Sequence, residues 1–97
     1  SAMSVDDALR QLKEYQDLSK KIIKIHFAFI KGENDSLDNL NEMCDALDKH
    51  KLLCEFNLVR YNPFSSEQGA ESDEAIIERN LNLLNSRFAG KVQMIPR

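Results

Sequence analysis

The spacing of hydrophobic positions alternates between a helical and a strand-like period along the whole chain. Apolar residues that recur every three or four positions predict helices over residues 5–20, 37–51 and 74–87. Between and after them, short runs rich in β-branched and aromatic residues predict strands over residues 22–30, 53–60 and 91–95. The pattern therefore predicts the element order αβαβαβ.

Small polar residues stand where the expected helices begin. Ser4, with Asp7 three positions later, is typical of a helix N-cap. Asp35 or Ser36 is placed to cap the second helix, and Ser72 is placed to cap the third. These residues support the boundaries that the hydrophobic spacing indicates.

The first expected strand, residues 22–30, is apolar on nearly both faces, which is typical of a strand buried inside a parallel sheet. His26 interrupts this run. A single histidine on an apolar strand is most often a hydrogen-bonded core residue, so we interpret His26 as structural rather than catalytic.

Helix–strand units repeated at this interval indicate right-handed crossovers and a parallel sheet, and hence an α/β fold. Ligands of such sheets gather at the carboxyl ends of the strands. The loops to consider are therefore residues 31–36 and residues 61–72, and the second is long and polar enough to be a functional loop.

Three parallel strands make a poor complete domain because their apolar edges need covering, and the chain stops at Arg97 inside or just past a strand. We therefore expect an excised piece, a single-domain fragment over residues 4–97, that could self-associate through its exposed sheet edges. Ser1 and Ala2 before Met3 are interpreted as a cloning remnant.

Composition narrows the class of protein. With 97 residues, 42% hydrophobic and 30% charged, the chain is expected to form one globular domain. The amino terminus lacks the apolar core of a signal peptide, and no apolar run is long enough to cross a bilayer. The net charge of −3 argues against a surface that grips nucleic acid everywhere.

Two cysteines and no targeting segment favour a reducing cytoplasm. Cys44 and Cys54 are too few and too far apart for a zinc or iron–sulfur site, so we expect buried thiols. His26 and His50 do not stand at metal-ligand spacing with other candidates. No P-loop, dinucleotide-binding glycine motif or serine nucleophile motif is present.

Two sequence blocks span the first and second expected strands and the turns after them. The first runs from Ile23 to Asp35 and ends in Gly32-Glu33-Asn34-Asp35, and the second begins Cys54-Glu55-Phe56-Asn57-Leu58 and ends in Asn62-Pro63-Phe64. Both blocks, and the distance between them, resemble the dual-specificity adenine-C2 methyltransferases of ribosomal and transfer RNA. The resemblance extends over nearly the whole chain but over only part of those enzymes.

This resemblance implies a radical S-adenosylmethionine (SAM) enzyme with a partial (β/α) barrel similar to a TIM barrel. In that family a four-iron four-sulfur (4Fe-4S) cluster, held by a Cys-x3-Cys-x2-Cys loop, binds SAM. A second SAM methylates a cysteine, and that methyl group passes to C2 of an adenine in 23S rRNA. The resemblance places the cluster motif before this segment and the cysteine after it. The fragment would therefore be the later half of the barrel, without catalytic activity on its own.

Asn62 is the one site residue that the resemblance carries over, because it matches the asparagine of the Asn-Pro-Phe motif that contacts SAM. A carboxamide at the carboxyl end of a strand offers a polar ligand both a donor and an acceptor. Pro63 would hold that asparagine in an extended conformation. Asn57 is expected to satisfy backbone groups within the barrel, and Cys54 is expected to pack.

The chain departs from the family at two places. His26 stands where the family usually has glutamate. The stretch 65–73 is acidic where the family is usually basic, and acidic side chains repel a phosphate backbone. This departure puts an RNA substrate in doubt more than it does the SAM chemistry, and it leaves room for another substrate.

A second reading of the sequence remains open. The chain could be a free-standing small α/β binding or oligomerisation module that has no cofactor and pairs through an exposed strand edge. Self-association would not separate the two readings, whereas SAM binding that depends on Asn62 would favour the enzyme fragment.

Overall fold

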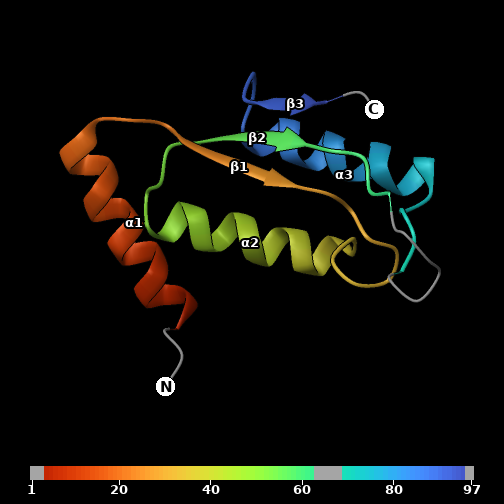
Figure 1. The fold of residues 1–97 in the computed structure, drawn as a ribbon, viewed down its shortest axis with the longest axis horizontal. Helices are drawn as coiled ribbons and strands as arrows, with labels where there is room; N and C mark the ends of the chain where they lie inside the picture. The colour runs from red at the N-terminus through yellow and green to blue at the C-terminus, as the bar shows by residue number, and fades with distance from the viewer. Residues whose placement is uncertain (1–3, 63–68, 96–97) are drawn as a thin grey trace.

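The computed structural model describes residues 4–62 and 69–95 (Figure 1). Its elements are α1 (Val5–Ser19), β1 (Ile23–Phe27), α2 (Leu37–Lys49), β2 (Cys54–Leu58), α3 (Glu74–Arg87) and β3 (Val92–Met94). The predicted order αβαβαβ is confirmed, and each helix and strand lies where the hydrophobic spacing placed it.

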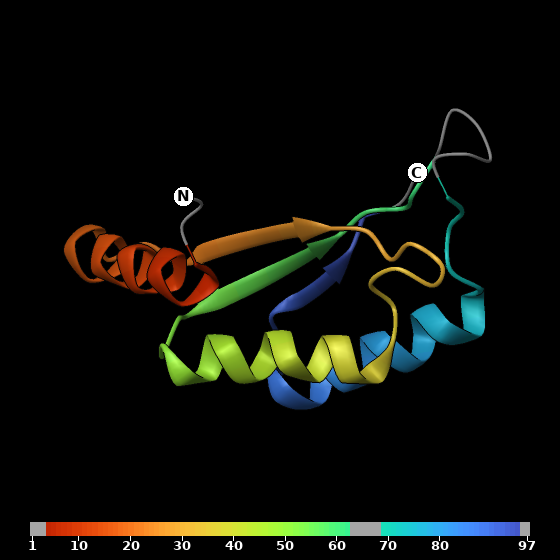
Figure 2. The ribbon, with the colours of Figure 1, turned by 90° about the horizontal axis from the view of Figure 1, so that it is seen from below.

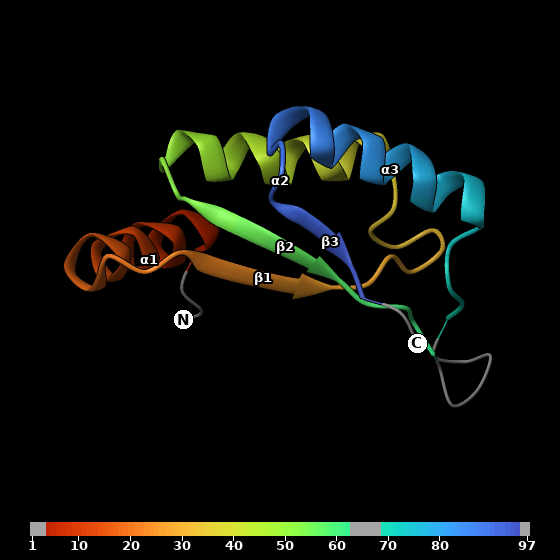
Figure 3. The same ribbon diagram turned by 90° about the horizontal axis from the view of Figure 1, so that it is seen from above.

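The strands form one parallel sheet with the order β1-β2-β3. Helices α2 and α3 lie along the same face of this sheet, and the described residues place no helix over the other face (Figures 2 and 3). Helix α1 lies beside the amino-terminal ends of the strands (Figure 1). The sheet is open, with β1 and β3 at its edges.

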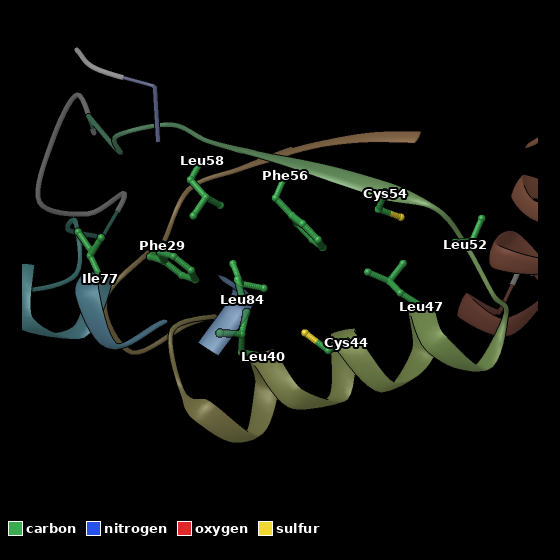
Figure 4. Close-up of a cluster of buried hydrophobic side chains, with 10 residues drawn as sticks. All are labelled: Phe29, Leu40, Cys44, Leu47, Leu52, Cys54, Phe56, Leu58, Ile77 and Leu84. Carbon is green, nitrogen blue, oxygen red and sulfur yellow. The ribbon is translucent and has the colours of Figure 1, made fainter. Parts of the chain in front are cut away.

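The core lies between the sheet and the pair of helices (Figure 4). Strand β2 alternates, and it turns Cys54, Phe56 and Leu58, all almost fully buried, toward the helices. The helices complete the core with residues at helical spacing, among them Leu40, Cys44, Leu47, Ile77 and Leu84. Burying each large apolar side chain stabilises the fold by about 1.5–3 kcal/mol.

Both cysteines are free thiols inside this core, Cys44 on α2 and Cys54 on β2. Burial raises the pKa of each thiol above its usual value, because a thiolate would lose its hydration there. The prediction of buried thiols is confirmed.

Strand β1 differs from its prediction. Lys24 and His26 are exposed, so only one face of β1 is covered, and the expectation of a strand buried on both faces was wrong. The strand also ends at Phe27. The next residues leave the sheet because Asn34 takes their hydrogen bonds: its Oδ1 accepts from Ile30 N at 2.8 Å, and its Nδ2 donates to Ala28 O at 2.9 Å.

Two of the three expected helix caps are confirmed. The hydroxyl of Ser4 accepts a hydrogen bond from Asp7 N, and that of Ser36 accepts one from Asn39 N, each at 3.1 Å. The third was wrong, since α3 begins after Asp73. Ser72 is buried instead, with its hydroxyl turned to a carboxylate of another loop.

Helix α1 docks through a polar residue rather than through its whole apolar stripe. Tyr15 and Leu18 share the helical spacing of Leu9 and Leu12 but are exposed, whereas Leu9 and Leu12 pack against the core. Gln16 is the buried residue of this helix. Its Nε2 donates to Lys21 O and Leu53 O and its Oε1 accepts from Leu53 N, all at 2.9 Å.

A second contact joins α1 to the end of α2. The carboxylate of Asp6 lies 3.0 Å from His50 Nε2 and 3.2 Å from Lys49 Nζ. The hydrogen bond with His50 and the adjacent Lys49 lower the pKa of Asp6. His50 therefore has a local structural contact.

Replacing Gln16 by alanine is expected to lower the free energy of unfolding by about 2 kcal/mol, because Leu53 N loses its acceptor and the carbonyls of Lys21 and Leu53 each lose a donor. The measurement is urea unfolding followed by circular dichroism. Gln11→Ala, at an exposed position of the same helix, is the control and should change the free energy by less than about 0.5 kcal/mol. Equal changes in the two variants would contradict the docking role of Gln16.

Candidate functional site

The two loops singled out in the sequence lie side by side at the carboxyl ends of the strands. Lys31 N donates to Ala70 O at 2.8 Å, and Ser72 N donates to Phe29 O at 3.3 Å. Between these bonds, Ile30 and Glu71 form an antiparallel bridge. The chain that follows β1 is therefore paired with the chain that leads into α3.

Asp35 is the residue that joins the most segments at this end of the sheet. Its Oδ1 accepts from Gly32 N at 3.1 Å, and its Oδ2 accepts from the hydroxyl of Ser72 at 2.6 Å. Its backbone carbonyl accepts from Asn80 Nδ2 at 2.9 Å and from Arg79 Nη2 at 2.8 Å. Gly32 has a φ of 76°, which favours glycine at this turn.

This arrangement shows what the Gly-x-Asn-Asp block does in the fold. Asn34 closes the turn, and Asp35 ties the turn to Ser72 and to α3. The sequence suggested only a turn and a possible cap, because a partner 37 positions away leaves no local signal. Asn80 is fully buried, and a polar residue on the inner face of an amphipathic helix was the one available hint.

Asn62 is exposed and follows β2 at the carboxyl edge of the sheet, where the sequence placed it. An exposed carboxamide at this position is free of the core and can contact a ligand. Pro63, Phe64 and residues 65–68 lie outside the described residues, as do Ser1 to Met3. The SAM contact of Asn62 therefore stays a prediction.

A row of polar side chains crosses the helix-free face of the sheet. His26 pairs in register with Asn57, and Asn57 pairs with Gln93. Asn57 Nδ2 lies 3.4 Å from His26 Nε2 rather than on the backbone groups expected for it. His26 is exposed here, so its assignment to the core was wrong.

The helix-free face also carries a pair of charged residues and a hollow. Next to the row, Lys24 pairs in register with Glu55. A hollow of about 150 Å³ lies at the β2–β3 side and is lined in part by Glu55, Asn57 and Gln93. The helix-free face therefore offers an imidazole and carboxamides, groups that can donate and accept hydrogen bonds.

The described residues contain no group of three or more His, Cys, Asp or Glu side chains that could hold a metal ion. Cys44 and Cys54 are buried in the core with raised thiol pKa values. An iron–sulfur cluster needs several accessible thiolates, so the side chains described here do not fit one. Within the same ranges, no helix has the length and apolar character needed to cross a membrane.

The charges at residues 69–73 are largely paired. Glu71 lies 2.7 Å from Arg60, and Asp73 lies 3.4 Å from Lys31. Glu67, another acidic residue of the stretch 65–73, lies outside the described residues. Because two of the carboxylates have cationic partners, this end of the sheet repels anions less than its sequence indicates.

The fold is one that a radical SAM enzyme contains. The crystal structure of a radical SAM methyltransferase from Sphaerobacter thermophilus matches 94% of this chain with a TM-score of 0.81 and 22% sequence identity. The matched part is 26% of that enzyme. The predicted fold class, an αβαβαβ fragment with a parallel sheet from a partial (β/α) barrel, is thus confirmed, and the sheet of the described residues is not closed.

Curated relatives give the same result from the sequence. The ribosomal RNA large subunit methyltransferases Cfr of Staphylococcus aureus and Staphylococcus warneri are each 32% identical to this chain over 87 residues. The match covers 84% of this chain but 25% of each relative, so the chain spans about a quarter of their length. No protein-family model matches the chain. The chain is a relative of one segment of the Cfr-like methyltransferases, and the resemblance inferred from the two blocks is confirmed.

Replacing Asp35 by alanine is expected to lower the free energy of unfolding by about 1–3 kcal/mol, since Gly32 N and the buried Ser72 hydroxyl lose their acceptor. Urea unfolding measures the loss, and amide hydrogen exchange at Ser72 should become faster. Asp38→Ala, an exposed carboxylate in the first turn of α2, should cost no more than about 0.5 kcal/mol. An unchanged exchange rate at Ser72 would show that Asp35 does not join the loops.

Proposed function

We propose that the chain forms one wall of a radical SAM methyltransferase-like barrel and that its helix-free face lines the interior. The observation that carries this proposal is the one-sided covering of the sheet, with α2 and α3 together on one face (Figure 3). In (β/α) barrels the helices lie outside, the strands enclose the interior, and the carboxyl ends of the strands carry the site. The uncovered face of this sheet is polar, as a surface lining a ligand site would be.

Within this wall, Asn62 is proposed to contact SAM through its carboxamide. The residue is exposed at the carboxyl edge of the sheet, where ligands of parallel α/β proteins bind. When bound, SAM supplies the methyl group and the precursor of the radical. The residues of this chain would bind and orient that cofactor, while the ligands of a 4Fe-4S cluster would come from another part of a longer protein.

The proposed substrate class is an adenine in RNA, by analogy with the relatives, whose names describe them as methyltransferases of large-subunit ribosomal RNA. His26, Asn57 and Gln93 carry groups that hydrogen-bond to a base edge. The ion pairs of Glu71 and Asp73 remove part of the objection that the acidic loop raised. A cytoplasmic location remains a prediction that accompanies this function.

Replacing Asn62 by alanine is expected to weaken SAM binding to this chain about tenfold, because a direct hydrogen-bonding group is lost. Isothermal titration calorimetry with SAM measures the change, and S-adenosylhomocysteine serves as a second ligand. Asn82→Ala, an exposed asparagine on α3, should leave the affinity within about twofold. Equal affinity of Asn62→Ala and the unsubstituted chain would remove Asn62 from the SAM site.

The reading frame around this segment provides an independent test. We expect it to encode a Cys-x3-Cys-x2-Cys motif upstream and a cysteine soon after the last strand. The upstream motif without the later cysteine would keep the radical chemistry and remove the methyl carrier. A frame that contains neither would favour the free-standing binding module, which has no cofactor.

A further inference from the structure

Asn62 lies at the end of a short segment that follows β2. Contacts from other parts of the chain hold the residues that precede it. We call residues 59–62 the outgoing arm and residues 69–73 the return arm. At the start of the outgoing arm, Val59 N donates to Phe27 O at 2.9 Å, which anchors it beside the end of β1. Asn62 itself is exposed, so its position depends on what holds the residues before it.

The return arm is held firmly on one side. Its backbone pairs with the chain after β1 through Ala70 and Ser72, with the Ile30–Glu71 bridge between them. The hydroxyl of Ser72, which is only 4% exposed, donates to Asp35. The return arm is therefore a fixed part of the structure.

A single ion pair joins the two arms in the described part of the chain. Arg60 Nη2 lies 2.7 Å from Glu71 Oε1, and the two side chains are only 21% and 15% exposed. The same guanidinium also donates hydrogen bonds from Nη1 and Nη2 to the carboxylate of Glu74, whose side chain is 73% exposed on the first turn of α3. Water and salt weaken an exposed pair far more than a mostly buried one. Although Glu74 accepts two hydrogen bonds from Arg60, its exposed carboxylate is the more screened partner, so Glu71 is the restraint on Arg60 that water and salt weaken less.

We propose that Glu71 is a positioning residue for Asn62. Its backbone belongs to the fixed return arm, and its carboxylate holds Arg60, which precedes Asn62 by two residues. The Gly-x-Asn-Asp turn thereby sets the position of the Asn62 carboxamide through Ser72, Glu71 and Arg60. The part of this inference that concerns SAM rests on the proposed function, whereas the restraint on Asn62 does not.

The test compares Glu71→Gln with Glu74→Gln in the complete 97-residue chain. Each substitution removes one negative charge beside the same guanidinium and keeps the size of the side chain. Glu71→Gln is expected to lower the 15N order parameter of the Asn62 backbone amide from about 0.85 to below about 0.6 and to weaken SAM binding about five- to tenfold. Glu74→Gln should leave the order parameter near its original value and the affinity within about twofold. Amide hydrogen exchange at Phe56 N, bonded to Lys91 O in the sheet, should stay unchanged in both variants.

Different results would separate the possible failures. Equal order parameters of Asn62 in the two variants, or no change in Glu71→Gln, would overturn the positioning role. Faster amide hydrogen exchange at Phe56 in Glu71→Gln would mean that Glu71 stabilises the whole fold, which would also overturn it. If the unsubstituted chain binds no SAM, the proposed SAM contact of this chain fails, and the order parameter of Asn62 still decides whether Glu71 positions it.

Discussion

The alternation of apolar and polar side chains along β2 is the constraint on which the rest of the structure depends. Cys54, Phe56 and Leu58 are buried against the helices, so Glu55 and Asn57 must point the other way. A shift of one residue in the pairing would exchange the two sets and place a carboxylate in the core. The same alternation, continued in β1 and β3, creates the polar face that the proposed function uses.

Much of this fold was predictable because it follows from local patterns. The spacing of Leu40, Cys44 and Leu47 indicated both α2 and its buried side, and Ser36 indicated where the helix begins. Parallel pairing followed from the repeated helix–strand order. Whether one or both faces of β1 are buried could not be predicted from its sequence. The exposure of a face depends on whether another layer of the protein covers it, and the residues of one strand do not determine that.

The candidate site was predictable in outline only. The Asn-Pro-Phe motif located Asn62 at the carboxyl edge of the sheet, but its ties to the fold are contacts between distant residues. Ser72 was predicted to cap α3 because serine before a helix often does so, but its hydroxyl donates a hydrogen bond to Asp35 instead. Similarly, the sequence shows Glu71 only as one charge of an acidic loop, because its ion pair with Arg60 forms only in the folded chain.

The contact that docks α1 has a consequence for how this sequence can diverge. Gln16 binds only backbone atoms of Lys21 and Leu53, so the side chains at these two positions take no part in the contact. Homologues can therefore vary residues 21 and 53 widely while the helix stays in place. Proline at position 53 is the exception, because it has no amide hydrogen to donate to the glutamine. Homologues are therefore expected to keep glutamine at position 16 while positions 21 and 53 vary, because the glutamine side chain binds main-chain atoms at those two positions.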